Sequence, residues 1–304
     1  MAVPDFQWWY LPLLQQLADG QVHRLADIYE QLADVAKLSE DDRAQRLPSG
    51  VQLTYRNRIG WARSFMNKAG LIASPGRALA QITDRGRTVL ASQPSRIDNA
   101  FLRQFPEFVE WVRQSNKGSA QSSVPVHTQD SDSETPIEAL ERIYQKLNGE
   151  LAEELLDRVK QSTPAFFEKV VVDLLLAMGY GGSHEDAGRT VGKSGDGGID
   201  GVINEDRLGL DVIYLQAKRW ESSVGRPVVQ AFAGSLEGVR AKKGVLITTS
   251  GFTNDAREYV KHIEKRIILI DGVQLADYMI RYNVGVAAEV RYEVKRMDGD
   301  YFES

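Results

Sequence analysis

A glycine-rich run, Ser-Gly-Asp-Gly-Gly-Ile-Asp-Gly at 194–201, places a carboxylate at the start of an apolar stretch. Glycines let the chain bend sharply and approach a ligand closely. Asp200, at the start of a strand predicted over 199–204, suits a hard cation such as Mg²⁺, which takes oxygen ligands and keeps several waters. Asp and Gly are also ordinary turn residues, so a simple turn without a metal site is an alternative interpretation of this run.

The stretch 211–219 predicts a second strand, in which alternate side chains share a face. Gln216 and Lys218 then lie on one face, roughly 6.5 Å apart along the strand. The connection 204–210 is short, so the two strands should pair as a hairpin that brings Asp200 to the same end as Gln216 and Lys218. A metal-bound carboxylate beside a lysine can hydrolyse phosphodiesters, because the metal polarises the phosphate and the lysine stabilises charge. A lysine that simply extends into solvent from a strand end is the alternative.

Glu168 lies in a helix predicted over 163–178, whose Thr-Pro start suits a cap followed by the first helical position. It shares a predicted face with Val171 and Leu175, part of an apolar stripe expected to pack on the sheet. An acid that faces inward needs a partner, such as a metal or a lysine. A Glu near the first turn also favours the helix dipole, so its position leaves both interpretations open.

The elements that must position these residues predict an α/β domain with a mixed sheet. Strands are expected at 199–204, 211–219, 244–249 and 266–270, and helices at 163–178, 227–240, 253–265 and 272–282. The stretch 187–194 fits a loosened P-loop pattern, but neither a strand before it nor a helix after it is predicted. We therefore expect no nucleotide cofactor.

The N-terminal part has the element order of a winged helix. Residues 6–35 carry helical periodicity, 39–46 are polar and turn-rich, and 52–69 predict a basic helix that Gly70 would terminate. Two short strands around a Ser-Pro-Gly turn follow, and another helix begins near Thr83. In a winged helix the basic helix enters the major groove of DNA and the hairpin touches the flanking backbone.

The charge distribution supports this reading. The chain has 304 residues and a net charge of −5, which alone argues against a nucleic-acid partner. Between Arg43 and Arg87, however, nine Lys or Arg accompany one acid, so this segment is +8 and the rest is −13. A basic block in an acidic protein is typical of a phosphate-binding surface, although an arginine-rich solvated helix face has the same composition.

Composition excludes several other classes. No apolar run approaches the roughly 20 residues of a membrane span, so no membrane partner is expected. The chain has no cysteine, hence no disulfide and no thiolate zinc site. The first residues lack the basic region and cleavage site of a signal peptide, and we expect a cytoplasmic protein.

Residues 116–135 are rich in Ser, Gln, Asp and Thr and predict a flexible linker, and 136–161 predict a charged amphipathic helix. We therefore divide the chain into a winged-helix DNA-binding domain at 1–95, a helical or flexible linker at 96–135 and a catalytic domain at 136–304.

Four motifs in this order resemble the catalytic domain of Mrr-type restriction endonucleases, within the PD-(D/E)xK nuclease superfamily. They are Gly-Asp-Gly-Gly-Ile-Asp-Gly, the strand with Gln-Ala-Lys, Val-Val-Gln-Ala-Phe-Ala-Gly at 228–234, and Gly-Val-Leu-Ile-Thr-Thr-Ser-Gly-Phe-Thr at 244–253. Tyr-Arg-Asn-Arg-Ile-Gly-Trp-Ala at 55–62 resembles the winged-helix domain paired with it in Mrr restriction proteins. Together the resemblances cover nearly the whole chain.

The resemblance implies a role for each candidate. Asp200 is the first metal ligand, Gln216 takes the place of the usual second acidic ligand, and Lys218 is the catalytic lysine. Glu168 matches the helical acid before the core strands, and Gln230 the glutamine on the following helix. The implied cofactor is Mg²⁺, with Mn²⁺ as a substitute, and the implied substrate is modified, often methylated, foreign DNA. Because an amide is a weaker Mg²⁺ ligand than a carboxylate, Gln216 leaves the number of metals open.

We expect double-stranded DNA as the partner, and a homodimer or higher oligomer because a duplex needs two scissions. The expected DNA contacts are Tyr55, Arg56, Arg58, Arg63, Lys68 and, on the wing, Arg77. A DNA-binding regulator with an inert nuclease fold is the main alternative, and the intact set of Asp200, Gln216 and Lys218 argues against it. A nuclease for branched DNA is a third reading, which the winged helix disfavours.

Overall fold

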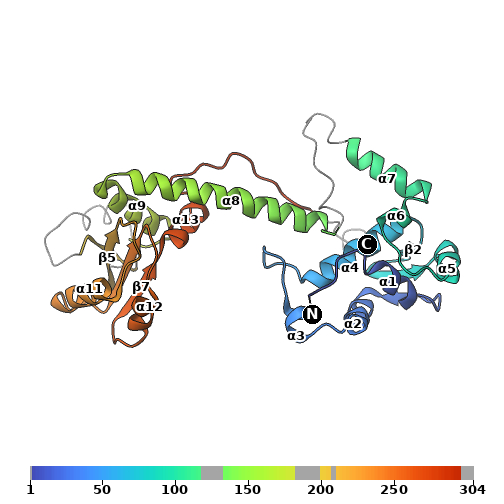
Figure 1. Cartoon of the computed structure of the whole chain (residues 1–304), viewed down its shortest axis with the longest axis horizontal. Coiled ribbons are helices and arrows are strands. Elements are labelled where there is room, and N and C mark those ends of the chain that lie inside the picture. The colour runs from blue at the N-terminus through green and yellow to red at the C-terminus, as the bar shows by residue number, and fades with distance from the viewer. Residues whose placement is uncertain (1, 118–132, 182–198, 207–209, 296–304) are drawn as a thin grey trace. The chain divides into compact units, whose positions relative to one another are not determined.

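The computed structural model describes residues 2–117, 133–181, 199–206 and 210–295. These residues form two compact units, one up to residue 145 and one over 146–295 (Figure 1). The division falls within helix α8 (Pro136–Gln161), which confirms the charged helix predicted there. Three predicted features lie outside the described residues: the P-loop-like stretch 187–194, the first five residues of the glycine-rich run, and most of the linker, 118–132.

The first unit contains, in chain order and before α8, α1 (Tyr10–Gln16), β1 (His23–Arg24), α2 (Leu25–Val35), α3 (Glu40–Ala44), α4 (Thr54–Lys68), β2 (Ile72–Ala73), β3 (Leu79–Ile82), α5 (Asp84–Ala91), α6 (Asn99–Leu102) and α7 (Pro106–Lys117). Helices α4 and α5 confirm the predicted basic helix and the helix that follows the hairpin. Gly70 ends α4 in the left-handed region at φ +71°, as expected of a C-terminal glycine.

Three short antiparallel strands form a sheet in the order β1-β3-β2, and β2 with β3 is the hairpin predicted around Ser-Pro-Gly. One prediction in this region is wrong. The passage 39–46, expected to be a turn, contains the short helix α3. The cause is a capping box, in which Asp42 N–H donates to Ser39 Oγ at 3.2 Å and Ser39 N–H donates to Asp42 Oδ2 at 3.0 Å.

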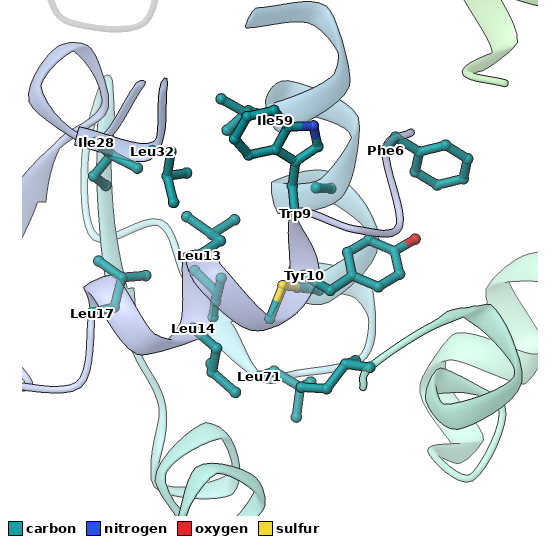
Figure 2. Packing of buried hydrophobic residues seen from close by; sticks show 14 of the residues in the cluster. Phe6, Trp9, Tyr10, Leu13, Leu14, Leu17, Ile28, Leu32, Ile59 and Leu71 are labelled. Carbon is teal, nitrogen blue, oxygen red and sulfur yellow. The ribbon is translucent and has the colours of Figure 1, made fainter. Parts of the chain in front are cut away.

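The core of this unit lies where α1, α2 and α4 meet (Figure 2). The side chains buried there include Trp9, Tyr10, Leu13, Leu14, Ile28, Leu32, Ile59, Met66 and Leu71. Two buried polar groups are satisfied: Trp9 Nε1 donates to the Pro4 carbonyl at 3.3 Å, and Tyr10 Oη donates to Asn99 Oδ1 at 2.7 Å. Each large apolar side chain buried in this way contributes about 1.5–3 kcal/mol. The core therefore fixes one face of α4.

The second unit contains the end of α8, then α9 (Pro164–Ala177), β4 (Gly201–Asn204), β5 (Val212–Lys218), α11 (Arg226–Gly238), β6 (Lys243–Thr248), α12 (Asn254–Lys261), β7 (Arg266–Ile270) and α13 (Gly272–Arg281). The strand order is β4-β5-β6-β7. Strand β4 is antiparallel to β5, whereas β5, β6 and β7 are mutually parallel. This mixed sheet and its helices confirm the predicted α/β class.

Helices cover both faces of this sheet (Figure 1). On one face Ile213, Leu215 and Ile247 pack with α9 and α13. On the other face Leu246 packs with α11 and α12, and Tyr214 lies against the same cluster. Alternation along β5 therefore assigns its even-numbered residues to the α11 side and its odd-numbered residues to the α9 side. Within the parts of the chain that are described, no helix is long and apolar enough to cross a membrane.

Candidate active site

The predicted catalytic residues lie at the edge where the parallel strands β5 and β6 end. Lys218 and Thr248 are register partners at this edge. Strand β4 begins there, because it runs antiparallel to β5 with Gly201 opposite Leu215. Carboxyl ends of neighbouring parallel strands are the usual place for a ligand site in such a sheet. The topology therefore brings Asp200, Gln216 and Lys218 together, as the sequence predicted.

Asp200 extends the β4–β5 pairing with both its main chain and its side chain. Its N–H donates to the Leu215 carbonyl at 2.8 Å, and its Oδ2 accepts the N–H of Ala217 at 2.8 Å. The carboxylate thus replaces a strand carbonyl and is fixed against the end of β5. Among the described residues, none donates to the other oxygen, Oδ1, and Asp200 is half-buried.

Gln216 and Lys218 follow each other along the α11 face of β5. Gln216 pairs in register with Leu246 and is only 5% exposed, so its amide is built into the interior beside the edge. Lys218 is half-buried, and none of the described carboxylates lies within ion-pair distance of its ammonium group. A half-buried cation without an acidic partner is electrostatically suited to an anionic substrate.

Three hydrogen bonds hold the main-chain carbonyl of Lys218. Its carbonyl accepts the N–H of Trp220 at 3.1 Å, the N–H of Thr249 at 3.2 Å and Thr248 Oγ1 at 2.9 Å. Sequence reasoning missed these residues, although the Thr-Thr-Ser run at the end of a predicted strand was a usable signal. They preorganise the point from which the Lys218 side chain leaves the strand.

Hydroxyl groups also join the loop after β5 to the loop after β6. Thr249 Oγ1 donates to the Trp220 carbonyl at 2.9 Å, and Ser250 Oγ donates to the Ser222 carbonyl at 2.7 Å. The Val224 N–H donates to the Gly251 carbonyl at 2.7 Å. Hydrogen bonds therefore join the loop after β5 to the loop after β6.

Arg219 ties the same edge to the end of α8 and to the residue that follows it. Its Nη1 donates to the carbonyls of Lys160 and Ser162, at 2.7 and 2.8 Å. A cation at a helix C-terminus satisfies carbonyls that have no intrahelical partner and interacts favourably with the helix dipole. Arg219 was not among the predicted site residues, and its role here is to position the strand end.

The expectation that Glu168 faces inward is wrong. The buried stripe of α9 runs through Phe167, Val171 and Leu174, and Glu168, next in sequence to Phe167, is exposed. Helix α9 also covers the face of the sheet opposite to Gln216 and Lys218. Val171 and Leu175 are buried as expected, but the buried stripe is centred between them and Phe167, Val170 and Leu174, so it does not extend to Glu168. Glu168 keeps a candidate role only as an exposed acid near the start of α9.

Gln230 lies on the second turn of α11, on the same side of the sheet as Gln216. It is exposed, because the buried stripe of α11 consists of Val229, Phe232, Ala233 and Leu236. Its position therefore leaves its side chain free to meet a substrate rather than to support the core.

Two of the residues predicted to touch DNA are structural instead. Tyr55 is 2% exposed and its hydroxyl donates to Glu30 Oε1 at 3.0 Å, so its assignment to the solvated face of α4 is wrong. Arg58 pairs with Glu138 at 2.8 Å and also donates to the Val3 and Pro4 carbonyls. It thereby anchors the chain start and the beginning of α8 to α4.

Arg56 is partly committed as well. Its guanidinium donates to Glu30 Oε1 at 2.6 Å, and this hydrogen bond is the main cause that lowers the pKa of Glu30 below its ordinary value. Arg63 and Lys68, in contrast, have no described acidic partner. Arg77 is exposed in the turn between β2 and β3. The cations best placed for a phosphate backbone are therefore Arg63, Lys68 and Arg77.

Arg63 also borders an open hollow of about 730 Å³ beside α4. Its walls include Tyr29, Gln52, Arg56 and Trp61. Burial raises the pKa of Tyr29, so this hydroxyl remains a neutral hydrogen-bond donor near the two arginines. Aromatic, amide and guanidinium groups together suit a nucleic acid, in which bases and phosphates alternate.

Comparison with known proteins decides the family. A family model described as a restriction endonuclease (Mrr_cat) matches residues 159–279, and the Mrr N-terminal domain model matches 6–92. The type IV methyl-directed restriction enzyme EcoKMrr of Escherichia coli (strain K12) is 39% identical over 318 residues, covering 100% of each chain. The chain belongs to the Mrr family of restriction endonucleases.

A solved structure of the MspJI restriction endonuclease with a 27-mer oligonucleotide is 21% identical over 68% of this chain and 49% of its own, at a TM-score of 0.29. That score is too low to bear on the geometry. The Mrr catalytic-domain match includes Glu168, Asp200, Gln216, Lys218 and Gln230, and the N-terminal match includes all of α4 and the hairpin. Endonuclease action on DNA follows from membership in the family.

The edge where β5 and β6 end has donors of the kind that a sparsely liganded divalent cation takes. Among the described residues, no three His, Asp or Glu side chains gather into a cage. Mg²⁺ does not need one, because it keeps several waters and binds proteins through one or two carboxylates and the substrate phosphate. Asp200 Oδ1 and the Gln216 amide would be the protein ligands at this edge.

Proposed function

We propose that this Mrr-family enzyme hydrolyses phosphodiester bonds of methylated duplex DNA with the help of Mg²⁺, for which Mn²⁺ can substitute. The supporting observation is the arrangement at the open end of the β4–β5 hairpin. There the Asp200 carboxylate, the buried Gln216 amide and a lysine with no acidic partner among the described residues lie together. The named activity of the E. coli relative, methyl-directed restriction, supports the choice of methylated DNA.

Asp200 and Gln216 would hold the cation. A bound Mg²⁺ polarises a phosphate and lowers the pKa of a coordinated water. The chain's own contribution at Asp200 is orientation, because the Ala217 N–H holds one of its two carboxylate oxygens. The burial of Gln216 excludes water from that side of the site, which strengthens electrostatic interactions there.

Lys218 would stabilise the negative charge that develops on the scissile phosphate. Its ammonium group has no described acidic partner to neutralise it, and its main chain is fixed by three hydrogen bonds. A preorganised charge of this kind costs little reorganisation during the reaction. Glu168 and Gln230, both exposed, are the remaining proposed contacts with the substrate.

The first unit would position the duplex as a winged helix, with α4 in the major groove and the β2–β3 hairpin at the flanking backbone. Arg63 and Lys68 on α4 and Arg77 on the hairpin would carry the phosphate contacts. Because a duplex needs two scissions, we propose that two catalytic units act together in a homodimer or higher oligomer. These units would work in the cytoplasm, where foreign DNA arrives.

The test is cleavage of one plasmid, prepared with and without methylation, by the full-length protein in Mg²⁺ and in EDTA. We expect cutting of the methylated plasmid in Mg²⁺ and none in EDTA. Equal cutting of both plasmids would contradict the preference for methylated DNA. Binding without cutting under every condition would favour the DNA-binding regulator with an inert nuclease fold.

A further inference from the structure

Trp220 stands out as a large aromatic side chain beside the catalytic edge. It is 41% exposed. Its ring has no aromatic partner, and its indole N–H has no acceptor among the described residues. A single exposed aromatic needs no explanation by itself. Its neighbours in the chain, however, are held by an extensive set of hydrogen bonds, and these fix the place at which the indole is presented.

The chain turns immediately after Lys218. The Trp220 N–H donates to the Lys218 carbonyl at 3.1 Å, which closes a three-residue turn centred on Arg219. Two residues span at most about 7 Å of chain, so the base of the indole stays close to the catalytic lysine. Successive bases of one strand are about 3.4 Å apart along the helix axis. The ring can therefore reach the nucleotides next to a phosphate held at Lys218.

The turn is rigid on both sides of Trp220. Thr249 Oγ1 donates to the Trp220 carbonyl at 2.9 Å, and Ser250 Oγ donates to the Ser222 carbonyl at 2.7 Å. The Arg219 Nη1 donates to the carbonyls of Lys160 and Ser162, at the end of α8 and just after it. Of the two long side chains that follow Lys218, Arg219 therefore makes hydrogen bonds within the unit, whereas the indole of Trp220 is 41% exposed.

We infer that Trp220 stacks on a base beside the scissile phosphate and holds the strand in register with Lys218. This inference rests on the proposed function, which places the scissile phosphate at Lys218. The apolar aromatic ring of Trp220 favours a base over a phosphate as its partner. An indole binds phosphate poorly but stacks on any base, and such contacts are insensitive to sequence. Aromatic and apolar wedges at base steps also unstack a duplex locally, which would open the backbone to the nucleophile.

The sequence provides a clean optical test. Of the five tryptophans, Trp8, Trp9, Trp61 and Trp111 lie in the N-terminal half, and Trp220 is the remaining one. A methylated duplex is titrated into the full-length protein in EDTA, and the loss of tryptophan fluorescence is compared between wild type and Trp220→Phe. The difference reports on Trp220 alone. We expect DNA to quench this difference signal, and an unquenched difference signal would overturn the inference.

Cleavage provides the second measurement. Trp220→Ala is expected to lower the rate at saturating methylated DNA by about tenfold or more, whereas Trp220→Phe, which still stacks, stays close to wild type. Tyr292→Ala is the matched control, because Tyr292 is an 82% exposed aromatic of the same unit. Unchanged cleavage by Trp220→Ala would overturn the inference and leave the proposed function intact. If wild type itself cuts nothing, the proposed function fails, and the fluorescence difference still decides whether Trp220 meets DNA.

Discussion

Asp200 and Ala217 are joined across the open end of the β4–β5 hairpin, where the Ala217 N–H donates to Asp200 Oδ2 at 2.8 Å. A side-chain oxygen thus occupies the position that a strand carbonyl would fill. The same carboxylate carries the charge that the proposed metal site needs. Different substitutions of Asp200 can therefore test the hydrogen bond to Ala217 and the negative charge separately.

The contribution of Asp200 to stability is tested by comparing two substitutions. Asp200→Asn keeps an oxygen that can accept the Ala217 N–H, so its free energy of unfolding should equal that of wild type. Asp200→Ala removes the acceptor and should lower the free energy of unfolding by about 1 kcal/mol. Urea denaturation of both variants measures this. Equal stability of Asp200→Ala and wild type would show that the bond contributes nothing.

Gln216→Glu tests whether position 216 binds the cation. A carboxylate is a stronger Mg²⁺ ligand than an amide, so we expect half-maximal cleavage at a several-fold lower Mg²⁺ concentration. Without metal, two carboxylates at one buried site repel each other, and the variant should melt at a lower temperature that Mg²⁺ restores. An unchanged Mg²⁺ requirement would remove Gln216 from the proposed ligands.

Arg63 and Arg58 on the same helix should behave differently when replaced by Ala. Arg63 has no described acidic partner, so Arg63→Ala should weaken DNA binding and reduce the slope of log affinity against log salt by about one. Arg58 pairs with Glu138, and both side chains are largely buried. Arg58→Ala should therefore lower the melting temperature. Salt-dependent binding and thermal melting of both variants measure this, and a reversed pattern would contradict the assignment.

Glu30 should make folding sensitive to acid. Its hydrogen bond from Arg56 lowers its pKa below the ordinary value of 4.5, so the carboxylate stabilises the folded state above that pH. This stabilisation is lost as the pH falls from about 4.5 through the lower folded-state pKa. In Glu30→Gln the melting temperature should fall less steeply over that range than in wild type. Parallel curves for the two proteins would show that the pair is unimportant.

Much of the fold could be predicted because periodicity and turn residues determine it locally. The strand at 266–270 was predicted to the residue, and the basic helix ended at Gly70 as its sequence indicated. The helix over 40–44 was not predicted, because none of its side chains is buried and a capping box stabilises it instead. Such a helix leaves no apolar period for sequence reasoning to detect.

The candidate site was predictable where it depends on strand alternation and was not where it depends on tertiary contacts. Pairing of β4 with β5 follows from the short connection, and it brings Asp200 to Lys218. The exposure of Glu168 depends on how α9 rotates against the sheet, and an apolar stripe with a broad border does not define that rotation. Tyr55 is buried in the core of the first unit, and its hydroxyl donates to Glu30, which is distant in sequence, so no local pattern indicates this arrangement.

Cleavage by Asp200→Asn tests the central claim most directly. The variant retains the acceptor for Ala217 and loses only the charge, so its fold and its DNA binding should match those of wild type. On the methylated plasmid in Mg²⁺, we expect a loss of cleavage of at least about a hundredfold, because the substitution removes the carboxylate that would hold the cation. Cleavage at the wild-type rate by a folded, DNA-binding Asp200→Asn protein would show that the chemistry takes place elsewhere.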